Sequence, residues 1–377
     1  MARRPTLFFA ALFAVLLLAV PTAAAAGEEP REMSLGEAVF RALCFSKSVE
    51  KAELELEKAE DARVSAAGAV QPQWYTTYEP GCEPLIFAAE SADFAYRSAR
   101  ESYRLARDTV VLDVYSRYYA VLQAQEKVAA KEAALTALEK RASVMQALVQ
   151  VGMAARTALL SLEAQVTSAE ADLTAAEGEL KNAYVSFNQL VKLPAEERPV
   201  LTDTAVFAPF AEDESRCVSW ATGENPTVWI AKYAEDYKQM VQNYDTGDPS
   251  TVIREEDVRM AELDAESAED AAALLGRTLY SSIESLEAAY SATAEGVRVA
   301  EEALRVVQVK FDLGMATSSE VAAAKANLAA ARQGLFDLAC EHAYLKLAAQ
   351  MPWAYLGVMA QSTAGIAAAA GEASRHP

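Results

Sequence analysis

Side chains that commonly carry catalysis or bind metals are sparse in this sequence of 377 residues. It contains two histidines, His342 and His376, and four cysteines at irregular spacing: Cys44, Cys82, Cys217 and Cys340. The sequence has no CxxC pair, and it lacks the GxSxG, HExxH and P-loop patterns that position nucleophiles, zinc ligands or phosphate-binding backbone. We therefore expect no enzyme activity, no metal and no cofactor. The pairing of the four cysteines stays open.

Two glycine triplets are better suited to recognition than to catalysis. Gly152 recurs 162 residues later as Gly314, and each is followed by a methionine. Glycine ends a helix in the left-handed conformation without steric cost. An apolar, adaptable methionine beside such a turn is typical of a docking surface. Simple helix termination is the alternative, but we favour a partner-docking tip formed by Val151, Gly152, Met153, Leu313, Gly314, Met315 and Thr317.

A third group of side chains is aromatic. The segment QPQWYTTY, residues 71–78, places Trp74, Tyr75 and Tyr78 beside a proline. Aromatic rings concentrate at membrane–water interfaces, so these residues are candidates for a membrane-proximal belt. Hydrophobic capping of helix ends is the alternative interpretation, and we favour it.

The glycine triplets belong to an internal repeat with the same offset of 162 residues. Apolar residues recur at alternating spacings of three and four before Gly152, over 121–149, and after it, over 159–190. The second copy keeps this pattern, and His342 falls in it as an expected packing residue. A mean period of 3.5 residues predicts long helices that pack along a heptad seam. Each repeat therefore reads as a long helix, a tight turn and a long returning helix.

A shorter helix is predicted before each long one. The first spans 35–69, with Ser34 and Glu37 as a capping box, and the second spans about 225–244, with Pro226 in its first turn. We expect an all-α fold of antiparallel coiled-coil hairpins. Its predicted parts are a first repeat over 27–199, a second over 200–356, and a disordered tail rich in Ala, Gly and Ser over 357–377.

Residues 1–26 read as a secretory signal peptide, with two arginines, an apolar run and small residues before Gly27. An uncleaved anchor is the less favoured alternative, because a spanning helix needs about 20 apolar residues. The formal net charge of −20 argues against a nucleic-acid partner. We expect an exported protein of the periplasm or cell envelope.

The duplication, the paired glycine turns and the helix start Leu35-Gly36-Glu37-Ala38 together resemble the TolC-like outer-membrane efflux family. The second tip matches that family's pattern through Thr317 and Glu320, whereas Ala155 and Ala158 replace the hydroxyl and the acid in the first. The resemblance covers about residues 33–353. It implies a homotrimer with a hollow helical α-barrel, and a periplasmic adaptor (membrane-fusion) protein and an inner-membrane pump as partners. It also implies contact with the outer membrane at the end opposite the glycine turns.

This sequence departs from the family in two places. The family inserts a β-hairpin into each repeat, but the connections here, 70–84 and 245–253, are short for spanning strands of about 9–11 residues. We therefore expect the β-barrel to be largely absent. The returning helix offers Asn327, Arg332 and Gln333 but no acid for a gate. Two functions stay open: a passive efflux-duct component, which we favour, and a barrel-less extracytoplasmic coiled-coil scaffold without transport activity of its own.

Overall fold

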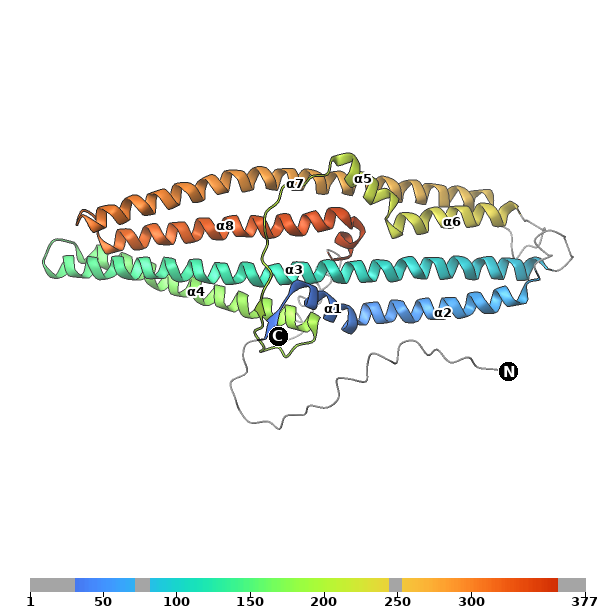
Figure 1. Ribbon diagram of the computed structural model, residues 1–377, viewed down its shortest axis with the longest axis horizontal. Helices are drawn as coiled ribbons and strands as arrows, with labels where there is room; N and C mark the ends of the chain where they lie inside the picture. The colour runs from blue at the N-terminus through green and yellow to red at the C-terminus, as the bar shows by residue number, and fades with distance from the viewer. Residues whose placement is uncertain (1–30, 72–81, 244–252, 359–377) are drawn as a thin grey trace, which may run out of the picture.

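The structure is a computed structural model that describes residues 31–71, 82–243 and 253–358. Nearly all of these residues lie in helices that run along one long axis (Figure 1). In chain order the elements are β1 (Glu32–Met33), α1 (Leu35–Phe45), α2 (Lys47–Ala69), α3 (Glu83–Gln150), α4 (Arg156–Val191), β2 (Val200–Leu201), α5 (Glu214–Gly223), α6 (Pro226–Asn243), α7 (Glu255–Asp312) and α8 (Ser318–Gln350). A short helical segment over 352–358 follows α8. The all-α prediction is confirmed.

The long helices form a single layer that is four helices wide. In the half that contains the glycine turns, α3 packs between α4 and α8, and α7 packs on the other side of α8 (Figure 1). In the other half, α3 packs between α2 and α6, and α7 packs on α6. With 68 residues, α3 is about 100 Å long and spans both halves. The layer therefore has two open faces and two free edges.

The largest buried side chains gather in the middle of the layer. Tyr118 and Phe187 lie in one cluster between α1, α3 and α4, and Leu112 and Ile283 lie in a second between α3, α7 and α8. The parallel pair of β1 and β2 closes the first cluster by joining Met33 to Leu201. These clusters hold the two halves together where α8 ends and α6 begins.

A connecting segment crosses the middle of the layer from β2 to α5 (Figure 1). We call residues 202–213 the strap. Its Asp203 N–H donates to Tyr118 Oη at 3.0 Å, and the Asp203 carboxylate accepts from the Leu35 N–H at 2.6 Å. Further along, Phe207 stacks on Tyr290 with ring centroids 3.7 Å apart. The strap thus ties α1 and α3 to α7 on one face of the layer.

The predicted first helix, 35–69, is wrong in one respect, because it is two helices that meet at Ser46. Ser46 has extended backbone and its hydroxyl accepts from the Val49 N–H, so its side chain caps α2 instead of continuing α1. Ser34 does cap α1, but the Glu37 carboxylate accepts from Arg31. Helix α5 was not predicted, whereas Pro226 begins α6 as expected.

Several predictions fall outside the described residues. They are the signal peptide, the aromatic residues Trp74, Tyr75 and Tyr78, most of the two short connections, and nearly all of the tail. The repeat boundaries stay predictions. Across the described ranges, none of the helices is both long enough and apolar enough to cross a membrane.

Candidate functional site

Both glycine turns adopt the same backbone geometry at the same end of the layer (Figure 1). Gly152 has φ of 77° and Gly314 has φ of 72°, which confirms the expected left-handed conformation. In the first turn the Met153 N–H donates to Leu148 O at 2.8 Å and the Gly152 N–H donates to Val149 O at 3.0 Å. Two such bonds define a Schellman motif, which satisfies the last carbonyl groups of a helix.

The second turn repeats this pattern at an offset of 162 residues. The Met315 N–H donates to Lys310 O at 2.7 Å, and the Gly314 N–H donates to Phe311 O at 2.9 Å. A Cβ added at either glycine would meet no described atom within 4 Å, so the φ angle rather than crowding demands glycine. The turns are therefore closed by backbone bonds that leave their side chains free for other contacts.

The apolar side chains of the tips lie in solvent. Met153 is 78% exposed and Met315 is 71% exposed, and Val151 and Leu313 are about as open. In a Schellman motif the residue after glycine often packs back on the helix, but such packing does not bury these methionines. Each triplet thus presents a small apolar knob at the end of its own hairpin. Their use as a docking surface stays a prediction.

The two tips differ at the start of the returning helix. Thr317 and Glu320 form a capping box in which the Thr317 N–H donates to Glu320 Oε2 at 2.6 Å and Thr317 Oγ1 accepts from the Glu320 N–H at 3.3 Å. The bond from the Thr317 backbone lowers the pKa of the Glu320 carboxyl. The equivalent cap of α4 is Ala155, which has no side-chain bond. Thr317 therefore caps α8. Its prediction as a docking residue did not distinguish this structural role from a role in docking.

Proteins with a similar architecture are found among solved structures. No family model and no curated protein matches the chain. Among solved structures, the outer membrane protein VceC of Vibrio cholerae matches with a TM-score of 0.60 and 15% identity, covering 85% of this chain and 95% of VceC. The CmeC outer membrane channel of Campylobacter jejuni matches with a TM-score of 0.60 and 11% identity, covering 89% and 94%. The MtrE outer membrane channel of Neisseria gonorrhoeae gives 0.58 and 15%, covering 85% and 88%.

The chain has a TolC-like fold. The resemblance seen in the sequence is thus confirmed at the level of architecture. Because each match covers most of both chains, the likeness extends over both helical hairpins rather than one helix pair.

In this TolC-like fold a network of hydrogen bonds attaches the strap to α7 and α8. His342, which is 1% exposed, lies with Nε2 3.0 Å from Glu287 Oε1. The same carboxylate oxygen accepts from the Phe210 N–H at 2.6 Å. Burial alone would raise the pKa of Glu287, but the bonds from Phe210 and His342 and the nearby Lys346 outweigh burial and lower it. His342 packs as expected, whereas its acidic partner was not predicted.

Two of the described cysteines are buried in the TolC-like fold, and burial changes the pKa of their thiols. Burial raises the pKa of the Cys340 thiol to about 12 and that of Cys217 to about 11, so both stay protonated at neutral pH. All four cysteines are free. Within the described residues, no cluster of three or more His, Cys, Asp or Glu side chains is arranged to hold a metal ion.

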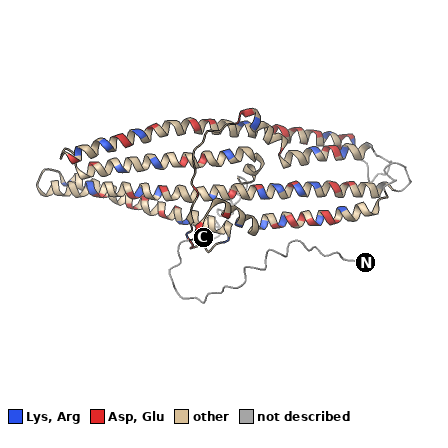
Figure 2. Cartoon of the chain, in the orientation of Figure 1, with Lys and Arg blue, Asp and Glu red and all other residues tan. Residues whose placement is uncertain are grey.

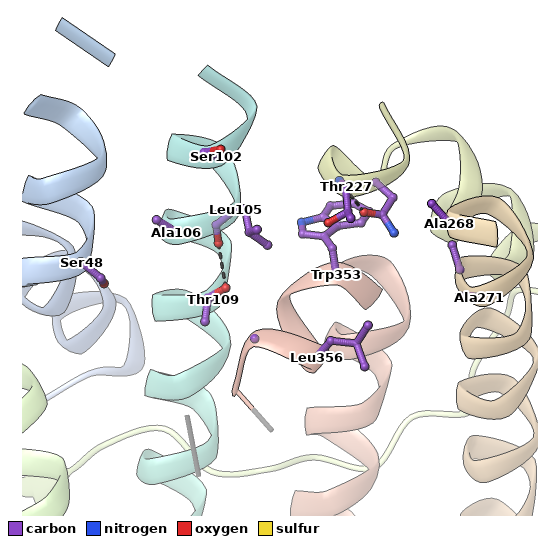
Figure 3. Close-up of a pocket in the computed structure, with 13 residues that line it drawn as sticks. Ser48, Ser102, Leu105, Ala106, Thr109, Thr227, Ala268, Ala271, Trp353 and Leu356 are labelled. Atoms are coloured by element: carbon purple, nitrogen blue, oxygen red, sulfur yellow. Dashed lines mark hydrogen bonds between the residues drawn. The ribbon is translucent and has the colours of Figure 1, made fainter. Parts of the chain in front are cut away.

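A cavity of about 520 Å³ opens where α8 ends and α6 begins (Figure 3). Trp353 forms one wall, and its Nε1 donates to Asp108 Oδ2 at 2.8 Å. Small and hydroxyl-bearing residues of α3 and α7, such as Ala106, Thr109 and Ala271, form the others. The Thr109 hydroxyl donates to Leu105 O at 2.8 Å, so it satisfies its own helix.

Proposed function

We propose that the chain is a subunit of a duct in the cell envelope, a passive conduit that works with a periplasmic adaptor protein and an inner-membrane pump. The observation that carries this proposal is the single helical layer with two open faces. A helix usually buries one apolar stripe against a second layer. A single layer that instead closes on copies of itself encloses a hollow interior.

Exposed apolar residues on a free edge of the layer support closure. Val299 and Val306 of α7, and Leu313 directly after that helix, are spaced by seven residues and are 69%, 39% and 69% exposed. Val299 follows the buried Val297 by two residues, which turns it about 200° away from the side that packs on α8. An exposed heptad stripe is typical of a helix seam that lacks its partner.

The opposite free edge of this half is α4, where Leu160 is 54% exposed. Joining the α7 edge of one copy to the α4 edge of the next is a head-to-tail contact, and such contacts form a ring when the rotation closes. The TolC resemblance implies three copies. The proposed signal peptide would deliver the subunit to the periplasm, with the glycine tips facing the adaptor and the other end facing the outer membrane.

The oligomeric state of the mature protein tests the duct. We expect light scattering to give the mass of a trimer and negative-stain images to show a ring with a hollow centre. A protein that stays monomeric at micromolar concentration in both measurements contradicts a self-made duct.

A second measurement separates the duct from the scaffold alternative. Cross-linking in the native envelope, followed by purification of the tagged chain, should recover an adaptor protein and an inner-membrane pump together. Recovery of envelope partners without any pump would favour the scaffold. A chain whose tips carry Met153→Asp and Met315→Asp is the matched control, because it should lose the adaptor while keeping its own oligomer.

A further inference from the structure

The cavity beside Trp353 lies at a break in the helical layer. Helix α8 ends at Gln350 and α6 begins at Pro226, and both pack between α3 and α7. The cavity of about 520 Å³ lies where neither helix fills that position (Figure 3). Small-molecule sites usually have volumes of about 300–1,000 Å³, so the cavity is large enough for such a ligand.

Small side chains keep this space open. The walls include four alanines, one on α3 and three on α7: Ala106, Ala268, Ala271 and Ala272. Protein interiors usually contain few voids larger than a water molecule, so an open space of this volume is unusual. On the other side, a Cβ added at Gly357 would lie 2.7 Å from Thr109 Oγ1. Glycine therefore lets the chain after α8 approach α3 closely and close the cavity there.

The aromatic wall is held in place by contacts outside the cavity. Trp353 is 3% exposed, its Nε1 donates to Asp108, and the guanidinium carbon of Arg104 lies 5.0 Å from its ring centroid. A ring fixed by a hydrogen bond and a cation–π contact loses little conformational entropy when a ligand binds. At the rim, Leu356 is 55% exposed, so a ligand would cover apolar surface there.

The lining carries no charge. Among the described residues, the thirteen that line the cavity include no Lys, Arg, Asp, Glu or His. In the whole chain 23% of residues are charged, and both signs lie along each long helix (Figure 2). Burying a charged group without a partner costs far more free energy than burying a neutral polar group. The lining therefore favours a neutral ligand.

One buried polar group of the lining has a donor to offer. Asn225 is 5% exposed, and its Oδ1 accepts from the Thr227 N–H at 2.9 Å, which caps the start of α6. Its Nδ2 donates to no described residue and remains accessible. Buried amide donors in folded proteins are nearly always satisfied. Asn225 is thus suited to a ligand oxygen that accepts a hydrogen bond.

We propose that this cavity binds a neutral, mostly apolar small molecule that carries one hydrogen-bond acceptor. The apolar part lies between the alanine walls and Trp353, and the acceptor takes a hydrogen bond from Asn225 Nδ2. Such a ligand contacts α3, α6, α7 and the chain after α8 where the two halves of the layer meet. The proposal goes beyond the duct and does not depend on closure of a ring.

The probe is 6-propionyl-2-(dimethylamino)naphthalene, a neutral ring system with a carbonyl acceptor whose emission moves to shorter wavelength in apolar surroundings. Titration into the mature protein should give saturable binding with this shift. A second probe carries a sulfonate in place of the propionyl group and should bind about tenfold more weakly, because the lining gives its charge no partner. Equal affinity of the two probes would overturn the assignment of a neutral ligand.

Filling the cavity should remove the probe. Ala271→Phe and Ala106→Phe place a ring in the space from opposite walls, and each should weaken binding about tenfold, because the apolar contacts with the probe are lost. Ala323→Phe is the matched control, since Ala323 is an exposed alanine of α8 outside the lining. It should bind the probe like wild type. If both cavity variants also bind like wild type, the site is wrong. Circular dichroism checks that each variant is folded.

The amide contact has its own test. Asn225→Asp keeps an oxygen that caps α6 but replaces the donor with a second oxygen, so the propionyl probe should bind about tenfold more weakly. A third probe with a propyl group in place of the propionyl group has no carbonyl and should lose distinctly less. Equal losses for these two probes would mean that Asn225 does not bind the acceptor.

Thermal melting separates this site from the duct. The propionyl probe should raise the melting temperature of wild type as its concentration rises, because it binds the folded state, and it should not do so for Ala271→Phe. A trimer that the probe does not stabilise would contradict the site and leave the duct intact. Probe binding at the cavity of a chain that stays monomeric would contradict the duct and leave the site intact.

Discussion

Gly152 and Gly314 have positive φ angles, whereas the methionines that follow them are exposed. Mutations should therefore distinguish backbone strain at the glycines from surface chemistry at the methionines. Gly152→Val or Gly314→Val should cost about 1–3 kcal/mol, because a β-branched residue strains the left-handed conformation. Met153→Asp with Met315→Asp should stay within about 0.5 kcal/mol of wild type, because both side chains are exposed.

Thermal melting and partner binding of the same variants check this prediction. The aspartate variant should melt like wild type and bind the adaptor poorly, since it places charge in an apolar contact. An aspartate variant that melts far below wild type would show that the methionines belong to the core. An aspartate variant that melts like wild type and binds the adaptor fully would mean that the tips only end the helices.

The Glu287 carboxylate gives a second prediction at this scale. Its folded pKa is lowered from the usual 4.5, so its stabilisation is complete above about pH 4.5 and is lost as the pH falls through the folded value. At pH 7, Glu287→Gln should cost about 1 kcal/mol, because a charged acceptor is lost to Phe210 and His342. This difference in stability should shrink between pH 5 and pH 3.

Denaturant melts of wild type and Glu287→Gln across that range measure the difference. Glu284→Gln, a change at an exposed residue on the same helix, is the control and should track wild type at every pH. If the difference in unfolding free energy stays constant down to pH 3, the charge of the carboxylate does not stabilise the attachment of the strap.

At the scale of elements, α5 packs closely on α7 at Gly276. A Cβ at Gly276 would lie 3.0 Å from Cys217 O, 3.1 Å from Ala221 Cβ and 3.1 Å from Val218 Cα. Gly276→Ala should therefore push α5 off α7 and cost about 1–3 kcal/mol. Gly296→Ala on the same helix meets no described atom within 4 Å and should stabilise by about 0.5–1 kcal/mol.

Opposite signs for these two alanines are the expected result in chemical denaturation. Because both changes raise helix propensity equally, their difference isolates the contact with α5. Two stabilising alanines would mean that α5 does not lie against α7 in solution.

The elements also show what the sequence could predict. The heptad seam extends over tens of residues in α3, α4, α7 and α8, so their existence and reversal at the glycines were predictable. Ser46 and α5 were missed because a single break or a helix of ten residues carries too short a pattern. The bond between His342 and Glu287 joins residues 55 apart, and the cavity beside Trp353 needs walls from α3 and α7. No local pattern encodes such neighbours.

At the scale of the molecule, the layer is thin for its length. Most of the fully buried large side chains lie near the strap, while the hairpin ends rely on alanine-rich seams that bury little apolar area per residue. Closure with further copies would give the long helices the second contact that a single layer does not supply. Stability and assembly should thus be coupled in this chain.

The α7 edge tests that coupling. Val299→Glu with Val306→Glu places two charges on the exposed heptad stripe of a single subunit, so the fold should keep its helical content. In the assembly each valine contributes about 1.5–3 kcal/mol when buried, so association should weaken by more than about a hundredfold. Light scattering should then report monomers where wild type reports trimers, with an unchanged far-ultraviolet circular dichroism spectrum.

Val206→Glu on the strap is the matched control, since Val206 is 78% exposed and does not belong to the heptad stripe of α7. It should assemble like wild type. If the edge variant keeps the wild-type mass, copies join through another surface and the heptad stripe is solvated. If it loses helical signal, the valines already pack within the subunit. The prediction holds only if the edge variant is monomeric and keeps its full helical content. Such a result would mean that one subunit folds by itself and that its α7 edge is needed for association.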